Sequence, residues 1–178
     1  MRFRAFAVLL MVSSAAPLLA QGGATPSNAS RLSERPTSGD TAYSSMQKRG
    51  GMAMGVDQYT STHRFDALPT GGRIELQRDS DDPKGIAAIR DHIRGIANAL
   101  TWGNFSTPEL VHMKEVPGAK VMREKRRVIS YRARDLPRGA ELVIVARDAR
   151  AIEAVHEFMA FQREEHHAGG MEGMRHTP

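Results

Sequence analysis

Hydrophobic and polar positions follow the same order twice along this chain. Residues 63–100 contain an alternating segment, a turn, a second alternating segment and a helical stripe, and residues 129–167 repeat that order. Strict alternation predicts a strand, whereas apolar residues three and four apart predict an amphipathic helix. The repeated unit is therefore strand, strand, helix. Because one such unit cannot bury its apolar face alone, we expect the two copies to share one core.

The turns and helix starts align the two copies. Leu-Pro-Thr-Gly at 68–71 corresponds to Leu-Pro-Arg-Gly at 136–139, and Asp82 and Asp148 each stand where they can cap a helix. The helical stripes correspond as well, as Ile86, Ile89 and Ile93 in the first copy and Ile152, Val155 and Met159 in the second. The predicted fold class is α+β, in two layers, with a four-stranded, mostly antiparallel sheet that carries two helices on one face.

Alternation also predicts which strand side chains face the helices. In the first strand His63 and Phe65 share the inward face, and Arg64 lies on the other. Tyr131 takes the position of His63 in the second copy and also falls inward. We therefore expect the His63 side chain to be at least partly enclosed by the core.

Residues 1–20 have the three parts of a secretory signal peptide. A basic start precedes a short apolar stretch and small residues that end at Ala20, which predicts export to the periplasm or the medium. Residues 21–50 are rich in small and polar residues without apolar periodicity, so we expect a disordered linker there. The folded domain is then expected over 51–168, followed by a flexible tail of Met and His residues over 169–178.

The composition limits the chemistry of an exported chain. There is no cysteine, so disulfides and thiolate ligands are excluded. The formal net charge is +5, and basic residues cluster over 120–134. Nucleic acid is not an expected partner outside the cytoplasm. The cluster is compatible with an anionic surface or an acidic ligand, but a solvated loop and the polar face of one strand are the favoured interpretation. No segment after the signal is apolar enough to predict a transmembrane helix in the mature chain.

The sequence lacks the motifs of familiar enzymes. No serine stands in a Gly-x-Ser-x-Gly turn, and no glycine loop for phosphate precedes a helix. His156 and Glu157 lack the second histidine that a zinc protease helix needs, because position 160 is Ala160. We therefore expect a binding protein rather than an enzyme.

Methionine and histidine remain as candidate metal ligands. Thioether sulfur suits Cu(I), and imidazole suits copper and zinc. In an extended segment Met52 and Met54 would point the same way, about 6.6 Å apart. The predicted metal ligands are Met52, Met54, His63, His112, His166 and His167, within a wider set that adds Met113, His156, Met171, Met174 and His176. Packing by methionine and hydrogen bonding by buried histidine are the alternatives.

Several segments resemble a family of small exported bacterial proteins of unknown biochemical role. The resemblance covers residue 52 to about residue 168. Members have a Thr-Thr-His strand, a Gly-Asp-Phe-Ser-x-Pro loop followed by Ile-His-Gly, and a C-terminal helix ending in Asp-His or Glu-His. The matching segments are 57–65, 71–72, 103–108, 111–112 and 155–166, and they imply corresponding positions at Met54, His63, His112 and His166. Here Asn104 replaces the Asp of the loop, and Met113 replaces the Gly.

Some members of that family carry the label aspartate carbamoyltransferase, which the residues of this chain do not support. That enzyme is far longer and needs a Ser-Thr-Arg-Thr-Arg type of phosphate loop together with a second substrate domain. This sequence contains neither feature.

Three functions stay open on the sequence alone. The first is an exported protein that holds copper or a similar transition metal through Met and His ligands. The second is an interaction module that binds an envelope protein or an anionic surface through the outer sheet face, which would carry Arg64, Arg73, Ser130, Arg132 and Arg134. The third is an enzyme in which His63 and His112 act as acid and base beside a carboxylate.

Overall fold

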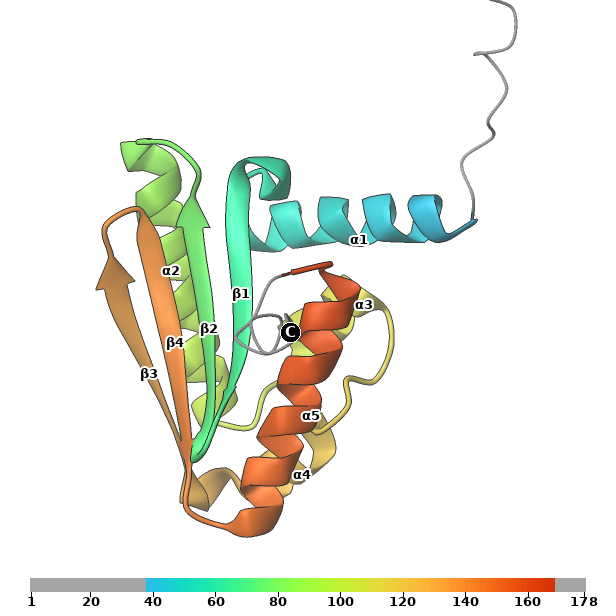
Figure 1. Cartoon of the computed structure of the whole chain (residues 1–178), viewed down its shortest axis with the longest axis vertical. Coiled ribbons are helices and arrows are strands. Elements are labelled where there is room, and N and C mark those ends of the chain that lie inside the picture. The colour runs from blue at the N-terminus through green and yellow to red at the C-terminus, as the bar shows by residue number, and fades with distance from the viewer. Residues whose placement is uncertain (1–37, 169–178) are drawn as a thin grey trace, which may run out of the picture. The chain divides into compact units, whose positions relative to one another are not determined.

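The computed structural model describes residues 38–168, which form an α+β domain. One sheet has the strand order β1 (Ser61–Leu68), β2 (Gly71–Arg78), β4 (Gly139–Ala146), β3 (Ile129–Leu136), and all three pairings are antiparallel. The helices are α1 (Ser38–Met54), α2 (Pro83–Thr101), α3 (Ser106–His112), α4 (Ala119–Glu124) and α5 (Ala149–Glu165), with 3-10 turns η2 (Gln58–Thr60) and η3 (Arg126–Val128) (Figure 1). The predicted fold class is confirmed. The predicted signal peptide and the Met/His tail lie outside the described residues.

Equivalent positions of the two hairpins make equivalent bonds where β2 meets β4. The amide of Arg78 donates to the carbonyl of Arg138, and the amide of Ala146 donates to that of Thr70, both at 2.8 Å. Each bond ties the end of one inner strand to the turn of the other hairpin. The two strand pairs are thereby related by a local pseudo-twofold arrangement.

Two glycines let these inner strands approach closely. A Cβ at Gly71 would lie 2.1 Å from the Ile144 carbonyl oxygen, and a Cβ at Gly139 would lie 2.0 Å from that of Leu76. Gly71 also has φ +148°, a backbone conformation that L side chains rarely adopt. The turn motif that aligns the two copies is therefore required by the contact between them.

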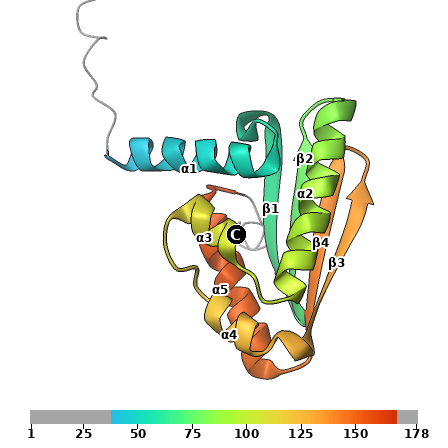
Figure 2. The same cartoon turned by 180° about the vertical axis from the view of Figure 1, so that it is seen from behind.

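Each long helix covers the hairpin of the other copy. Helix α2 packs on β3 and β4, whereas α5 packs on β1 and β2, and Figure 2 shows α2 lying along the inner strands and β3. Asp82 and Asp148 cap the two helices as predicted, each accepting from an amide three residues on at 3.0 Å. Because the helices cross over, neither copy has a core of its own.

The predicted linker is wrong for its last part, because residues 38–50 form most of α1. This helix has a weak apolar stripe and three glycines, so its sequence does not predict a stable helix. Tertiary contacts stabilise it instead. Met46 is only 4% exposed, and the guanidinium of Arg49 donates to the Val111 carbonyl at 2.7 Å.

The long connection between α2 and β3 folds over the same side of the sheet. It contains α3 and α4 and contributes buried side chains to the core, among them Phe105 and Met122. Phe105 meets Phe158 of α5 edge-on at 6.1 Å between ring centroids. This packing brings His112, the last residue of α3, toward α5. None of the helices formed by residues 38–168 is long and apolar enough to cross a membrane.

Candidate metal-binding cavity

A cavity of about 100 Å³ lies between the sheet and the helices α1, α2, α3 and α5. Apolar side chains from β1, β2, β4, α2 and α5 form most of its wall, including Phe65, Leu76 and Ile93. Its polar lining is dominated by imidazole and amide groups. These belong to His63, His92, His112, His166, Gln58 and Gln162, and the thioether of Met54 joins them.

Three of these imidazoles come from distant parts of the chain and meet in one cluster. His63 is on β1, His112 ends α3, and His166 follows α5. The ring centroids of His63 and His166 are 5.2 Å apart with planes inclined by 25°, and those of His112 and His166 are 5.1 Å apart and nearly perpendicular. The sequence predicted all three as candidate ligands. Their convergence follows from the helix crossover and from the folded connection.

Burial keeps these imidazoles neutral at ordinary pH. It lowers the pKa of His63 from 6.5 to about 4 and that of His166 to about 3, and in both cases a neighbouring imidazole adds repulsion. Burial also lowers the pKa of His112 and His92. A neutral imidazole carries a lone pair on one ring nitrogen, which is the form that coordinates metals.

Some of the ring nitrogens have protein partners and others have none. Nε2 of His112 lies 3.1 Å from Oε1 of Gln162, and His92 bonds to the backbone carbonyl of Ala53. Nδ1 of His112 and Nδ1 of His166 are buried without a hydrogen-bond partner. Such unsatisfied buried nitrogens are uncommon in proteins and indicate either a ligand position or a functional strain.

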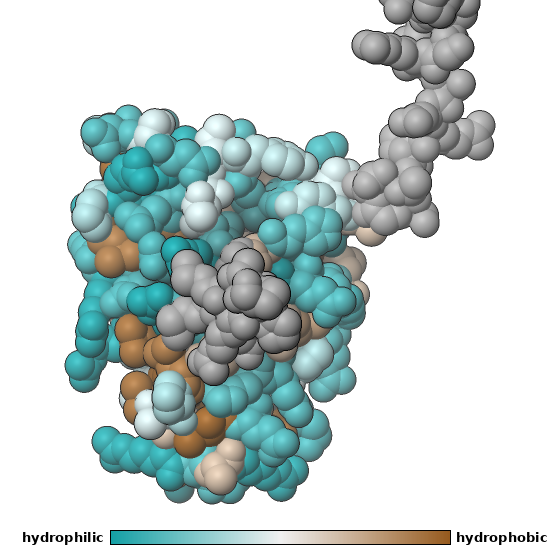
Figure 3. Space-filling view, in the orientation of Figure 1, coloured by the Kyte–Doolittle hydropathy of each residue, from teal (hydrophilic) through white to brown (hydrophobic). Residues whose placement is uncertain are grey.

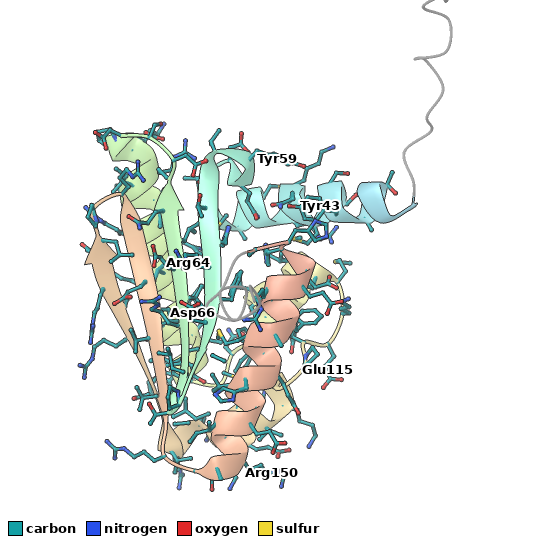
Figure 4. The ribbon with its side chains drawn as sticks, in the orientation of Figure 1. Tyr43, Tyr59, Arg64, Asp66, Glu115 and Arg150 are labelled. Carbon is teal, nitrogen blue, oxygen red and sulfur yellow. The ribbon has the colours of Figure 1, made fainter. Side chains whose placement is uncertain are left out.

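Four other candidate ligands among residues 38–168 do not line the cavity. Met52 is 77% exposed, because the segment is helical and residues two apart face different sides of a helix. His167 is exposed and stacks on Tyr43 at 4.2 Å between centroids; Tyr43 is labelled on α1 in Figure 4. Met113 is exposed, and the ring of His156 is bound 2.8 Å from the Leu68 carbonyl. The predicted set thus divides into an inner group and a surface group.

Sequence reasoning missed two polar residues of the cavity, Gln162 and His92. Gln162 is a buried polar residue on the apolar stripe of α5, three residues after Met159. A polar side chain on such a stripe is a signal that could have marked it. His92 was not among the candidate ligands, but it lines the cavity.

The side chains as placed do not form a complete cage of hard or borderline ligands. Within residues 38–168 no group of three or more His, Cys, Asp or Glu side chains is arranged to hold a metal ion. The thioether of Met54 is not among those ligand types.

Comparisons with protein-family models, with curated proteins and with solved structures found no match. The resemblance to small exported bacterial proteins stays a prediction. The function of this chain must therefore be inferred from the geometry of the cavity.

Proposed function

We propose that this chain is an exported binding protein that holds copper, as Cu(I), in the cavity lined by Met54, His63, His112 and His166. A single observation carries the proposal. One thioether and three neutral imidazoles, contributed by four separate elements, line the same small cavity. No carboxylate belongs to that lining, so the available donors are sulfur and nitrogen.

This donor set favours Cu(I) over other common metal ions. Thioether and imidazole are the soft and intermediate ligands that Cu(I) accepts, whereas Mg²⁺ and Ca²⁺ require oxygen. Structural zinc sites are closed by four ligands that usually include thiolates, and this chain has no cysteine. Cu(I) is stable with two or three ligands, which this cavity can supply. The export predicted from residues 1–20 fits the use of methionine in place of cysteine.

Copper titration of the purified protein tests the proposal. Under anaerobic conditions, with a chromophoric Cu(I) chelator as competitor, we expect one equivalent to be retained. Met54→Leu removes the sulfur and nearly preserves the volume, so at least a tenfold loss of affinity is expected with little change in stability. Met46→Leu, a buried methionine of the same helix that does not line the cavity, is the matched control.

Two results would contradict the proposal. One is a wild-type protein that loses Cu(I) fully to the chelator at equal concentrations. The other is an affinity that Met54→Leu and His166→Gln leave unchanged, since both remove a proposed ligand. Circular dichroism of each variant separates the loss of a ligand from the loss of the fold.

A second candidate function is binding to an anionic surface, but the outer sheet face supports it poorly. Arg73 forms an ion pair with Asp66 at 2.6 Å, and Arg134 approaches Glu141 at 3.5 Å. Two of the four arginines proposed for that face therefore have acidic partners. Figure 3 shows a largely hydrophilic surface in this view, with several apolar areas among the polar residues.

Unpaired positive charge gathers instead where η3 and the end of β4 meet the start of α5. Arg126, Arg127, Arg147 and Arg150 are all exposed, and none forms an ion pair with another side chain of residues 41–168. The amide of Arg147 donates to the Val128 carbonyl at 3.0 Å, which places the two segments side by side. Arg150 is labelled at this end of the domain in Figure 4.

Vesicle binding tests this second candidate. Each arginine near an anionic bilayer contributes roughly 1 kcal/mol, so the protein should co-sediment with phosphatidylglycerol vesicles but not with phosphatidylcholine vesicles. The double change R126E/R127E should abolish binding. The matched control K48E/K84E, which reverses two exposed lysines elsewhere, should not. Vesicle binding that is unchanged in 0.5 M salt would contradict this second function. An equal loss of binding in both double variants would contradict it as well.

A further inference from the structure

The cavity is polar at one end and apolar at the other. Two helices supply lining residues at a spacing of four, which places each set along one side of its helix. These residues are His92, Ile96 and Leu100 on α2, and His166, Gln162 and Phe158 on α5 and its C-cap. Both sets run from an imidazole to a hydrocarbon side chain. Eight helical residues span about 12 Å, so the lining extends over about that length.

The polar ends of the two sets meet at His63. Its ring centroid lies 5.2 Å from that of His166. Burial lowers the pKa of His63, and repulsion from His92 lowers it further. Gln58 lines the cavity as well, and helix α1, which contributes further lining residues, lies across this end of the domain (Figure 1).

Two buried polar atoms of this lining have no hydrogen-bond partner. They are Oε1 of Gln58 and Nδ1 of His166. Gln58 is only 7% exposed, and its Nε2 donates to the Gln47 carbonyl at 3.3 Å, so the amide is held while its oxygen stays free. An amide oxygen needs a donor, whereas a ring nitrogen donates or accepts according to its tautomer. A hydroxyl group can satisfy either atom, because it both donates and accepts.

The charge of the lining restricts the ligand further. No Lys, Arg, Asp or Glu is present among the described residues that line the cavity. His63 and His166 are neutral at ordinary pH because burial lowers their pKa to about 4 and about 3. A carboxylate or an ammonium group would therefore lose its hydration without gaining a counter-charge. A neutral ligand with one polar end avoids that cost.

We infer that the metal-free cavity binds a small neutral alcohol, with its hydroxyl at the end formed by Gln58 and His166 and its hydrocarbon chain beside Leu100 and Phe158. No metal is needed for this binding, so it stands apart from the proposed copper function. The cavity volume of about 100 Å³ is of the same order as that of an apolar protein cavity of ~150 Å³ that takes up benzene. A ligand of the size of hexanol is therefore expected to fit.

Titration of the metal-free protein with hexanol, hexanoate and hexane tests the inference. Calorimetry, together with NMR shifts of the lining methyl groups, should show saturable one-to-one binding of hexanol. Hexanoate should bind at least tenfold more weakly at pH 7, because its charge must be desolvated. Hexane should also bind roughly tenfold more weakly, because it leaves the buried polar atoms unpaired.

A glutamine pair tests the polar end of the cavity. Gln58→Leu removes the acceptor, so it should weaken hexanol binding by roughly tenfold and leave hexane binding at least as strong. Gln47→Leu is the matched control. Gln47 is also 7% exposed, and its Oε1 also lacks a partner, but it does not line the cavity. The affinity of this control for hexanol should equal that of the wild-type protein.

An isoleucine pair tests the hydrocarbon part. Ile96→Phe adds volume within the lining and should abolish hexanol binding. Ile86→Phe changes a residue of the same helix and burial class that lies outside the lining, so it should leave binding unchanged. Circular dichroism of each variant shows whether it has folded.

Several results would overturn the inference. They are the absence of saturable hexanol binding, hexanoate or hexane binding as tightly as hexanol, and unchanged affinity in folded Gln58→Leu or Ile96→Phe variants. A protein that retains Cu(I) but binds no hexanol overturns this inference alone. A protein that binds hexanol but no Cu(I) overturns the proposed function alone.

Discussion

His63 and His166 stack inside the cavity, with ring centroids 5.2 Å apart, although 103 positions separate them in the sequence. Two imidazoles at this distance cannot both take up a proton without repulsion in a poorly solvated space. The His63 ring lowers the pKa of His166 in this way, in addition to the larger effect of burial, whereas the imidazole that lowers the pKa of His63 is that of His92. The pair links the folding of the domain to pH.

We expect the domain to lose stability as pH falls from about 6.5 toward 4. In the unfolded chain each histidine binds a proton near pH 6.5, whereas folded His63 does so only near 4 and His166 near 3. The unfolded state thus binds more protons in this window, so the free energy of unfolding rises with pH through it and is fully present above 6.5. At about 1.4 kcal/mol per pKa unit, His63 alone accounts for at most about 3 kcal/mol.

Urea denaturation at a series of pH values measures this effect. His166→Gln should flatten the curve between pH 6.5 and 4, since it removes the titrating group whose pKa is lowered to about 3. A wild-type stability that stays constant over this window would contradict the assigned environment of the pair.

Copper binding should resist mild acid. Protons compete for a ligand only below its pKa in the folded protein, and those of His63 and His166 lie near 4 and 3. The affinity for Cu(I) should therefore change by less than about threefold between pH 7 and pH 5.5, which competition titrations at each pH can determine. An ordinary exposed imidazole site would weaken across this range. A tenfold loss by pH 6 would show that solvated histidines hold the metal.

Alanine at either turn glycine should strongly destabilise the domain. A Cβ at Gly71 or Gly139 would lie within 2.1 Å of a carbonyl oxygen on the neighbouring inner strand. Backbone cannot yield as a flexible side chain can, so we expect each change to lower the free energy of unfolding by about 3 kcal/mol. Thermal melting of the two variants measures this, and the larger loss is expected for Gly71→Ala, because the φ of +148° at Gly71 also disfavours an L side chain.

A third glycine offers the control for that comparison. Gly95 lies within α2 and is exposed, and no atom lies within 4 Å of a Cβ built there. Gly95→Ala should stabilise the domain by about 0.5–1 kcal/mol through helix propensity. A loss of stability at Gly95 would mean that the steric account of Gly71 and Gly139 is incomplete.

Helix α1 should be part of the cooperative fold. A chain that begins at residue 51 lacks Met46 and Arg49, which contribute a buried side chain and a bond to the Val111 carbonyl. We expect it to be at least about 2 kcal/mol less stable than a chain that begins at residue 36. Denaturant melts of both chains give the comparison. Equal stability would mean that α1 is only loosely attached.

Much of the scaffold follows from local patterns. Alternation placed His63 and Phe65 on the inward face, and the two aspartates and the turn glycines marked helix starts and hairpins as the structure has them. These patterns depend on residues only a few positions apart, so they can be recognised in the sequence without knowledge of the tertiary structure. Helix α1 was missed for the converse reason, because its own residues scarcely favour a helix and distant contacts stabilise it.

The sequence identified candidate ligands but not which of them line the cavity. The choice of Met54, His63, His112 and His166 came from residue chemistry and from a family resemblance, and the structure brings these four to one cavity. Met52 and His167 have the same chemistry but lie at the surface. Residue type cannot separate the two groups, because burial depends on which elements pack together.

The sequence by itself determined two strand–strand–helix units, their turns, and the inward sides of their strands, because each depends on short-range sterics and on the period of apolar residues. Only the tertiary structure decided that each helix crosses to the other hairpin, that α3 turns back over the sheet, and that three imidazoles meet beside Met54. These outcomes depend on contacts between residues 41 to 103 positions apart, from Arg94 with Asp135 to His63 with His166. The low pKa values of the histidines depend on the same contacts, since desolvation exists only once all the covering elements are in place.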